Sequence, residues 1–246
     1  MVGAELPFAG HPTIGTLWYC ANHYLPKEVL RQETGDRWIP ITLNAKAGKI
    51  EAGYNPRTGF AKASIPQDVH IHTETLTQTS LLSSQPALRQ FAGQIQERLP
   101  LVSIVKGMTF ALIELPSVET LGSVHLPQAH PDVALDEGWM PSFVGTFYFC
   151  RIRNASAPRH TEKLRVRMLQ ENIEDPATGS GSAALGSYLA LQRKEAGEFR
   201  FEITQGIERG QKSEIVVTVT VIEEGKVDKV VLEGTAVQVM KGKLEV

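Results

Sequence analysis

The stretch Ile173-Glu-Asp-Pro-Ala-Thr-Gly-Ser-Gly-Ser-Ala-Ala-Leu-Gly-Ser-Tyr-Leu-Ala190 decides the fold that the sequence predicts. It is typical of a loop that turns into a helix: Pro176 fixes the backbone, Thr178 or Ser180 can cap, and residues 183–191 favour a helix. The small residues of the turn let another molecule approach the backbone closely. A helix N-terminus attracts anions, and Asp175 adds an acid beside it. The stretch therefore predicts chemistry on a small carboxylate-bearing molecule.

A second stretch near the start of the chain has the same design. It reads Glu5-Leu-Pro-Phe-Ala-Gly-His-Pro-Thr-Ile-Gly-Thr-Leu-Trp-Tyr-Cys-Ala21. A small-residue loop with Gly10 and Pro12 leads to a capping Thr13 and an apolar helix, which we expect to be buried on most sides. His11 occupies the place that the other stretch gives to its acid. Two such units predict two similar halves that face one cleft.

Size and composition limit the class of protein. The chain has 246 residues, of which 42% are apolar and 21% charged, enough for one large domain or two lobes of ~120 residues. A net charge of −2 gives no reason to expect a nucleic-acid partner. The apolar runs are too short to cross a membrane, and residues 1–6 do not resemble a signal peptide. Two cysteines, Cys20 and Cys150, make no disulfide framework, so a cytoplasmic location fits best.

Hydrophobic periodicity and turn residues predict the order of the elements. In the first half we expect a helix at 13–24, a polar connection at 28–36, strands at 38–43, 48–54 and 60–64, a loop at 67–82, a helix at 85–99, strands at 101–105 and 108–115, a short helix at 117–121, and a connection between lobes at 122–140. In the second half we expect strands at 143–152 and 163–169, a helix ending near residue 194, and strands at 199–205, 214–222, 227–232 and 235–240. The fold class is therefore α+β, with many short strands around one apolar helix in each half.

These motifs resemble those of the PhzF family of phenazine-biosynthesis proteins, which has the diaminopimelate-epimerase fold. The matching segments are residues 5–16, residues 174–180, and Gln205-Gly-Ile-Glu-Arg-Gly210 followed by Ser213. The resemblance implies two pseudo-symmetric lobes, residues 1–121 and 122–246, each a curled and mainly antiparallel sheet around a central helix, with the last strand able to return to the first lobe. It further implies an active site between the lobes, a homodimer, and no metal or organic cofactor.

The resemblance also implies roles for individual residues. His11 and Asp175 match the family's catalytic residues, and the residues that shape the loops and bind substrate match Gly10, Pro12, Thr178, Gly179 and Ser180. The implied activity is an isomerase that moves a proton on a small carboxylate-bearing metabolite. Related epimerases use two cysteines, whose places here are held by Gly10 and Asp175, so an epimerase or racemase is a weaker alternative.

One departure from the family affects the expected activity. The family's principal acid/base is a glutamate in a Ser-Glu-Thr type motif, some tens of residues before the first matching segment. This chain begins only a few residues before that segment, so we expect an incomplete first lobe and impaired activity. Glu5 is a poor substitute, because it precedes the loop. A non-catalytic binding or interaction protein that keeps the fold is the alternative from another class.

Other patterns have simpler interpretations. The pairs His70/His72 and His125/His130 lack a matching cysteine or carboxylate pattern, so we expect no metal site. The glycines and serines at 179–182 lack the spacing and the lysine of a nucleotide-binding P-loop. The arginines that alternate on the predicted strands are expected on a solvated face; they are Arg151, Arg153, Arg165 and Arg167.

Overall fold

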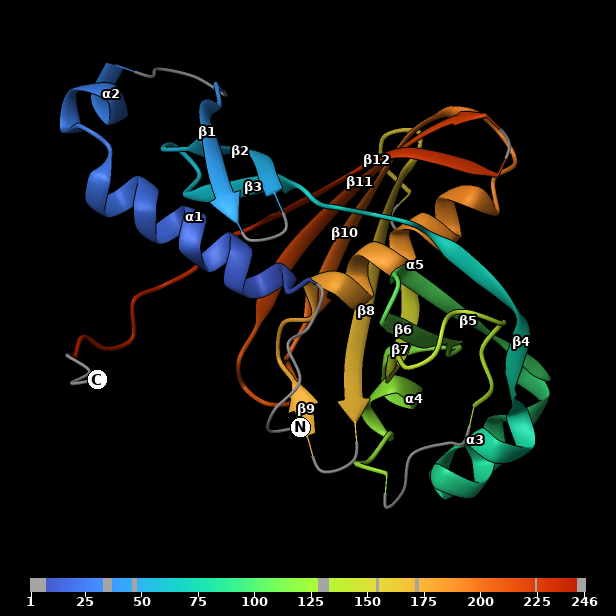
Figure 1. Cartoon of the computed structure of the whole chain (residues 1–246). Coiled ribbons are helices and arrows are strands. Elements are labelled where there is room, and N and C mark those ends of the chain that lie inside the picture. The colour runs from blue at the N-terminus through green and yellow to red at the C-terminus, as the bar shows by residue number, and fades with distance from the viewer. Residues whose placement is uncertain are drawn as a thin grey trace.

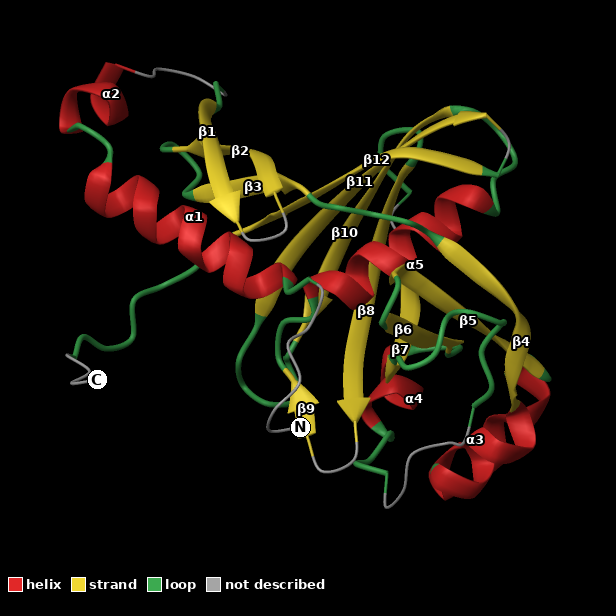
Figure 2. Cartoon of the chain, viewed as in Figure 1, coloured by secondary structure: helices red, strands yellow, loops and turns green. Residues whose placement is uncertain are grey.

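The computed structural model describes residues 8–32, 37–45, 48–127, 133–153, 155–170, 173–223 and 225–242. Its strands form one curved sheet, shown in Figures 1 and 2. The strand order is β1 (Ile39–Ala45), β2 (Gly48–Asn55), β3 (Phe60–Ser64), β12 (Lys226–Gly234), β11 (Ser213–Glu223), β10 (Gly197–Gln205), β8 (Thr161–Gln170), β7 (Phe143–Ile152), β6 (Met108–Glu114), β5 (Arg98–Val105) and β4 (His70–Thr77).

Most neighbouring strands in this sheet run antiparallel. The exceptions along the sheet are β6 with β7 and β8 with β10, which are parallel. A short strand, β9 (Ile173–Asp175), pairs with β8 outside the main order. The α+β class and the mainly antiparallel sheet are therefore confirmed.

Helix α5 (Gly179–Leu191) lies inside the curl of the larger part of the sheet. It packs against β5, β6, β10, β11 and β12, and all of its residues except Tyr188 and Leu191 are buried. Such complete burial requires a helix that is apolar or small on every side. The sequence from Ala183 to Ala190 meets that requirement, so its interpretation as a central helix is confirmed.

Helix α1 (Gly10–Tyr24) is covered on one face only, in contrast to the expected burial on most sides. Ile14, Leu17 and Ala21 are buried with the spacing of one helical face, and they lie against β2, β3 and β12. On the opposite side Tyr19 is 40% exposed, and Tyr24 at the end of the helix is 73% exposed. The small group of strands beside α1 reaches only one side of the helix (Figure 1).

Two apolar clusters lie on the two faces of the central strands. Phe147 and Phe149 point into the cluster around α5, whereas Tyr148 points into a second cluster with Leu81, Leu88 and Leu99. This alternation is that of a strand buried on both faces. The second cluster is covered by α3 (Gln78–Ser84), by the 3₁₀ helix η1 (Pro86–Gln94) and by α4 (Val118–Gly122).

Several expected elements were wrong. The polar connection at 28–36 contains α2 (Lys27–Gln32), whose Leu30 packs on the core. The predicted loop at 67–82 forms the edge strand β4 and helix α3, which Thr77 caps by accepting a hydrogen bond from the Ser80 N–H. The predicted helix at 85–99 is the 3₁₀ helix η1 followed by the start of β5. Residue propensity alone favoured a loop at 67–82 and a helix at 85–99. In the structure, pairing between β4 and β5 makes parts of both segments strands.

The C-terminal segment also differs from the expectation. Residues 235–242 form no strand, and residues 236–242 lie beside Gly15, Trp18 and Tyr19 of α1. The boundary between residues 121 and 122 stays a prediction; β6 before it and β7 after it are paired in the sheet. None of the helices in the described part of the chain is long and apolar enough to cross a membrane.

Candidate active site

The two loop-to-helix units meet at their helix starts (Figure 1). A Cβ atom added to Gly10 would lie 2.8 Å from the Gly179 Cα, and one added to Gly179 would lie 3.0 Å from the Gly10 Cα. The side chain of Leu232 on β12 lies against both glycines. No larger residue fits without moving backbone, so the contact explains why glycine occupies the first position of each helix.

Backbone N–H groups at these two helix starts are available to a ligand. The first N–H groups of a helix have no intrahelical acceptor. In α1 they belong to Gly10 and His11, since Pro12 has none; in α5 they belong to Gly179, Ser180 and Gly181. Within the described residues neither N-cap, Ala9 or Thr178, makes a side-chain capping bond. Together the two N-termini form a region of positive potential.

Thr13 and Thr178 do not cap the helices as expected. The hydroxyl of Thr13 donates to the Ala9 carbonyl at 2.9 Å, one turn earlier. The hydroxyl of Thr178 donates instead to Asp175 Oδ2 at 2.8 Å. Among the described residues, neither threonine hydroxyl therefore occupies the N-terminal amides of its helix.

A cavity of ≈ 220 Å³ opens at this junction. It is lined by Gly10, His11, Asp175, Thr178 and Ser180. The rest of its wall is largely apolar and comes from β6, β7, β8 and neighbouring segments, with Phe8, Ala9, Met108, Phe110, Phe143, Met168, Gln170 and Ile173. A cavity that is mostly apolar, with a few polar groups together, can orient a small ligand.

The remaining predicted residues lie close by but not on this cavity. Gly179 lines a neighbouring cavity of ≈ 360 Å³, which shares His11 and includes Ser213. Pro12 lines neither cavity, and its contribution is to remove an N–H from the first turn of α1. Glu5 lies outside the described residues. Neither Cys20 nor Cys150 lines either cavity.

The carboxylate of Asp175 is held by its own loop. Its Oδ1 accepts the Ala177 N–H at 3.2 Å, and its Oδ2 accepts the Thr178 hydroxyl at 2.8 Å. These bonds leave further lone pairs on both oxygens for a ligand. The local turn therefore fixes the side chain before any substrate binds.

Gln205 is a site residue that its motif did not reveal. Its side chain is fully buried, and its Nε2 donates to the Asp175 carbonyl at 2.7 Å and to Thr178 Oγ1 at 2.9 Å. Its Oε1 accepts the Thr178 N–H at 2.9 Å. Gly206 follows with φ +78, where a Cβ would lie 2.2 Å from the Gln211 carbonyl oxygen. The Gln-Gly pair was visible in the sequence, but its partner lies about thirty residues away.

Arg167 corrects the expectation of a solvated arginine. It is 6% exposed and forms a two-bond fork with Glu174, in which Nε–Oε1 and Nη2–Oε2 are each 2.9 Å. Its Nη1 donates to the carbonyls of Leu121 and Val124 at 3.0 and 2.7 Å. The guanidinium therefore ties the residue before Asp175 to the end of α4. A charge that is paired and hydrogen-bonded in this way can remain buried at this position.

Sequence comparison finds relatives that match most of the chain. An isomerase of uncharacterized function from Mesorhizobium japonicum is 27% identical over 249 residues, which are 98% of this chain and 76% of that protein. The trans-2,3-dihydro-3-hydroxyanthranilate isomerase of Pseudomonas aeruginosa is 26% identical over 213 residues, 85% of this chain but only 64% of that enzyme.

Solved structures show the same fold. The crystal structure of a Bacillus anthracis phenazine biosynthesis protein of the PhzF family superposes with a TM-score of 0.69 at 22% identity, over 99% of this chain and 78% of that one. A predicted epimerase from Pseudomonas aeruginosa gives a TM-score of 0.53 at 19% identity, over 94% of this chain and 72% of that one. The sequence model of the phenazine biosynthesis-like proteins, PhzC-PhzF, matches residues 2–242. The chain therefore belongs to the PhzC-PhzF family of phenazine biosynthesis-like proteins.

Proposed function

We propose that this protein is an isomerase of the PhzF type that moves a proton between carbon atoms of a small carboxylate-bearing metabolite. One observation carries the proposal: the uncapped N-termini of α1 and α5 meet at Gly10 and Gly179, where His11 and Asp175 line the same small cavity. The relatives named as isomerases support the reaction class.

In this proposal the helix starts bind the substrate carboxylate. The N–H groups of Gly10 and Ser180 donate to its oxygens, and the Ser180 hydroxyl adds another donor on the cavity wall. The apolar side of the cavity, with Phe110 and Met168, holds the carbon skeleton and keeps water away.

Asp175 and His11 carry the proton in this proposal. One of them removes a proton from a substrate carbon, and the electron pair shifts along the conjugated skeleton. The other returns a proton to a different carbon, so that the net change is an isomerisation without oxidation. This chemistry uses no cofactor.

The proposal is tested by following proton exchange directly. The protein is incubated in D₂O with trans-2,3-dihydro-3-hydroxyanthranilate and with a panel of other unsaturated small carboxylates, and ¹H NMR records both isomerisation and loss of carbon-bound protons. We expect exchange with at least one compound, and a loss of about 10²–10⁴-fold in Asp175→Asn and His11→Ala. His23→Ala, on the same helix but near its other end, is the control.

Three results would redirect the interpretation. Binding of a carboxylate without any exchange by the wild-type protein would favour the non-catalytic binding protein over the isomerase. Unchanged exchange in both variants would show that the reaction takes place elsewhere. Exchange at one α-carbon with inversion, and without movement of a double bond, would indicate an epimerase or racemase.

A further inference from the structure

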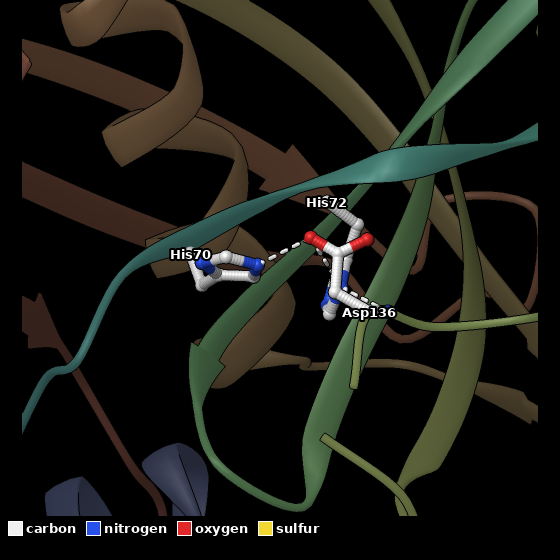
Figure 3. A group of neighbouring side chains, drawn as sticks. All are labelled: His70, His72 and Asp136. Atoms are coloured by element: carbon white, nitrogen blue, oxygen red, sulfur yellow. Dashed lines mark hydrogen bonds and ion pairs between the residues drawn. The ribbon is translucent and has the colours of Figure 1, made fainter. Parts of the chain in front are cut away.

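Three side chains of the type that binds metals converge away from the cavity, as Figure 3 shows. His70 and His72 come from β4, and Asp136 comes from the segment that precedes β7. One ligand atom from each lies within 4.8 Å of the others. The sequence alone predicted no metal site, because no cysteine or carboxylate pattern matches these histidines. Asp136 is 64 residues from His72 and is brought to it by the fold.

We propose that His70, His72 and Asp136 bind a divalent transition-metal ion, with Zn²⁺ the best match. The Asp136 Oδ2 lies 2.8 Å from His70 Nε2 and 3.8 Å from His72 Nδ1. Around a tetrahedral zinc ion with ligands at ~2.0–2.1 Å, ligand atoms are about 3.3–3.4 Å apart. The two observed distances lie on either side of that value, and all three ligand atoms lie within 4.8 Å of one another, so side-chain rotations would have to bring them to the tetrahedral spacing.

The hydrogen bonds of His72 hold it in the tautomer that a metal requires. Its Nδ1 accepts the Asp136 N–H at 3.2 Å, so this nitrogen carries a lone pair. Its Nε2 is 2.9 Å from Ser103 Oγ, and a chain of hydroxyls continues through Thr109 to Ser142, which donates to the Phe143 carbonyl. A ligating histidine normally donates its other ring N–H in this way. On binding, the metal would take the place of the Asp136 N–H as the partner of His72 Nδ1.

The carboxylate of Asp136 has a supporting shell as well. It accepts the Thr73 hydroxyl at 2.8 Å and the Thr73 N–H at 3.1 Å. These donors lie where the pairing of β4 with β5 is interrupted, between Ile71 and Thr75. On the other side the Trp139 ring stacks on His70, with centroids 4.4 Å apart and planes 11° from parallel. The metal would thus tie the edge strand β4 to residues 136–139.

The proposal does not depend on the proposed isomerase activity. None of the three residues lines the two cavities at the helix junction. Three protein ligands leave a fourth coordination position for water. The hydrogen bonds of Asp136 to Thr73 also form without a metal, so the experiment has to separate ion binding from a clamp made of hydrogen bonds alone.

The test is a titration of the chelator-treated full chain with CoCl₂, followed by visible absorption, and with ZnCl₂, followed by thermal unfolding. We expect one Co²⁺ per chain, micromolar affinity, and a higher melting temperature with Zn²⁺. His70→Asn and Asp136→Asn are expected to weaken binding by at least the about 10–100-fold that loss of a supporting residue costs.

His160→Asn is the matched control. His160 also pairs with a carboxylate, at 3.2 Å from Glu195, and also stacks on an aromatic ring, that of Phe199. Among the described residues it belongs to no group of three or more side chains that could hold a metal ion, and asparagine tolerates its φ of 62°. This variant is expected to bind Co²⁺ as the wild type does. Absence of a saturable Co²⁺ spectrum, or equal losses in His70→Asn and His160→Asn, would overturn the proposal and leave a hydrogen-bonded clamp only.

Discussion

The buried amide of Gln205 donates to the main-chain carbonyl of Asp175 at 2.7 Å. The same amide group donates to Thr178 Oγ1, and the Thr178 hydroxyl in turn donates a hydrogen bond to the Asp175 carboxylate. Gln205, at the end of β10, thus holds the backbone of Asp175 directly. It also holds the Asp175 carboxylate indirectly, through the hydroxyl of Thr178. Asp175 is therefore positioned by the sheet as much as by its own turn.

Replacing Gln205 by alanine should lower both stability and activity. The change leaves the Thr178 N–H and the Asp175 carbonyl without their partner, at a cost of about 1–3 kcal/mol for each group that stays dry. Gln85→Ala is the control, because Gln85 is equally buried and exchanges two bonds with the His125 backbone far from the cavity. Thermal unfolding should show losses in both variants, and kcat only in Gln205→Ala. Equal kcat values in the two variants would show that Gln205 does not position Asp175 for catalysis.

Alanine at Gly10 and at Gly15 should have opposite effects in the same helix. At Gly10 the new methyl group would meet the Gly179 backbone at 2.8 Å, and overpacking of this kind costs about 1–3 kcal/mol. At Gly15 nothing lies within 4 Å, so alanine should stabilise the helix interior by about 0.5–1 kcal/mol. Urea unfolding of both variants measures the change in the free energy of unfolding, which should be a decrease for Gly10→Ala and an increase for Gly15→Ala. A stable Gly10→Ala protein with an intact site would contradict the tight helix junction.

The two cysteines should differ in reactivity toward a thiol reagent. Burial in β7 raises the pKa of the Cys150 thiol to about 11, with the nearby Arg165 only partly offsetting it. Only the thiolate reacts. Cys20 on α1 is half-buried. At pH 8 we expect the native wild type to be labelled once and Cys20→Ser not at all until denaturant is added. Rapid labelling of native Cys20→Ser would show that β7 opens readily.

Glu233→Gln should stabilise the protein at neutral pH and lose its advantage in acid. Burial raises the pKa of this carboxyl above the ordinary 4.5, although Arg200 and Lys62 oppose the shift. Because the folded-state pKa is the higher one, the charged form disfavours folding above that pKa. The penalty disappears as the pH falls through the folded pKa toward 4.5 and below.

Melting temperatures of wild type and Glu233→Gln between pH 3.5 and 8 measure this difference. Glu202→Gln removes a carboxylate that also faces Arg200 but is 38% exposed, and it serves as the control. A gain that stays constant over the whole range would point to packing rather than to charge.

The sequence predicted the parts of the site that are local. The two small-residue loops and the apolar helices that follow them each lie within one short segment, where residue type determines backbone geometry, although α1 begins at Gly10 and not at the expected residue 13. It missed the groups that arrive from distant strands. Gln205, Arg167 and Asp136 act through partners that only strand pairing brings near, and no periodicity within their own segments indicates those partners. The edge strand β4 was missed for the same reason, since a polar stretch becomes a strand only when β5 is beside it.

Strand β12 has a consequence for how the cavity can change size. Within the described sheet it is the strand that joins the α1 side to the α5 side, through four residue pairs with β3 from Val231–Ser64 to Gly234–Ala61. Its Leu232 also lies beneath Gly10 and Gly179. Widening the gap between the two helix starts therefore has to bend or slide this ladder. We therefore expect a crosslink across β3 and β12 to restrict any widening of the gap between the two helix starts.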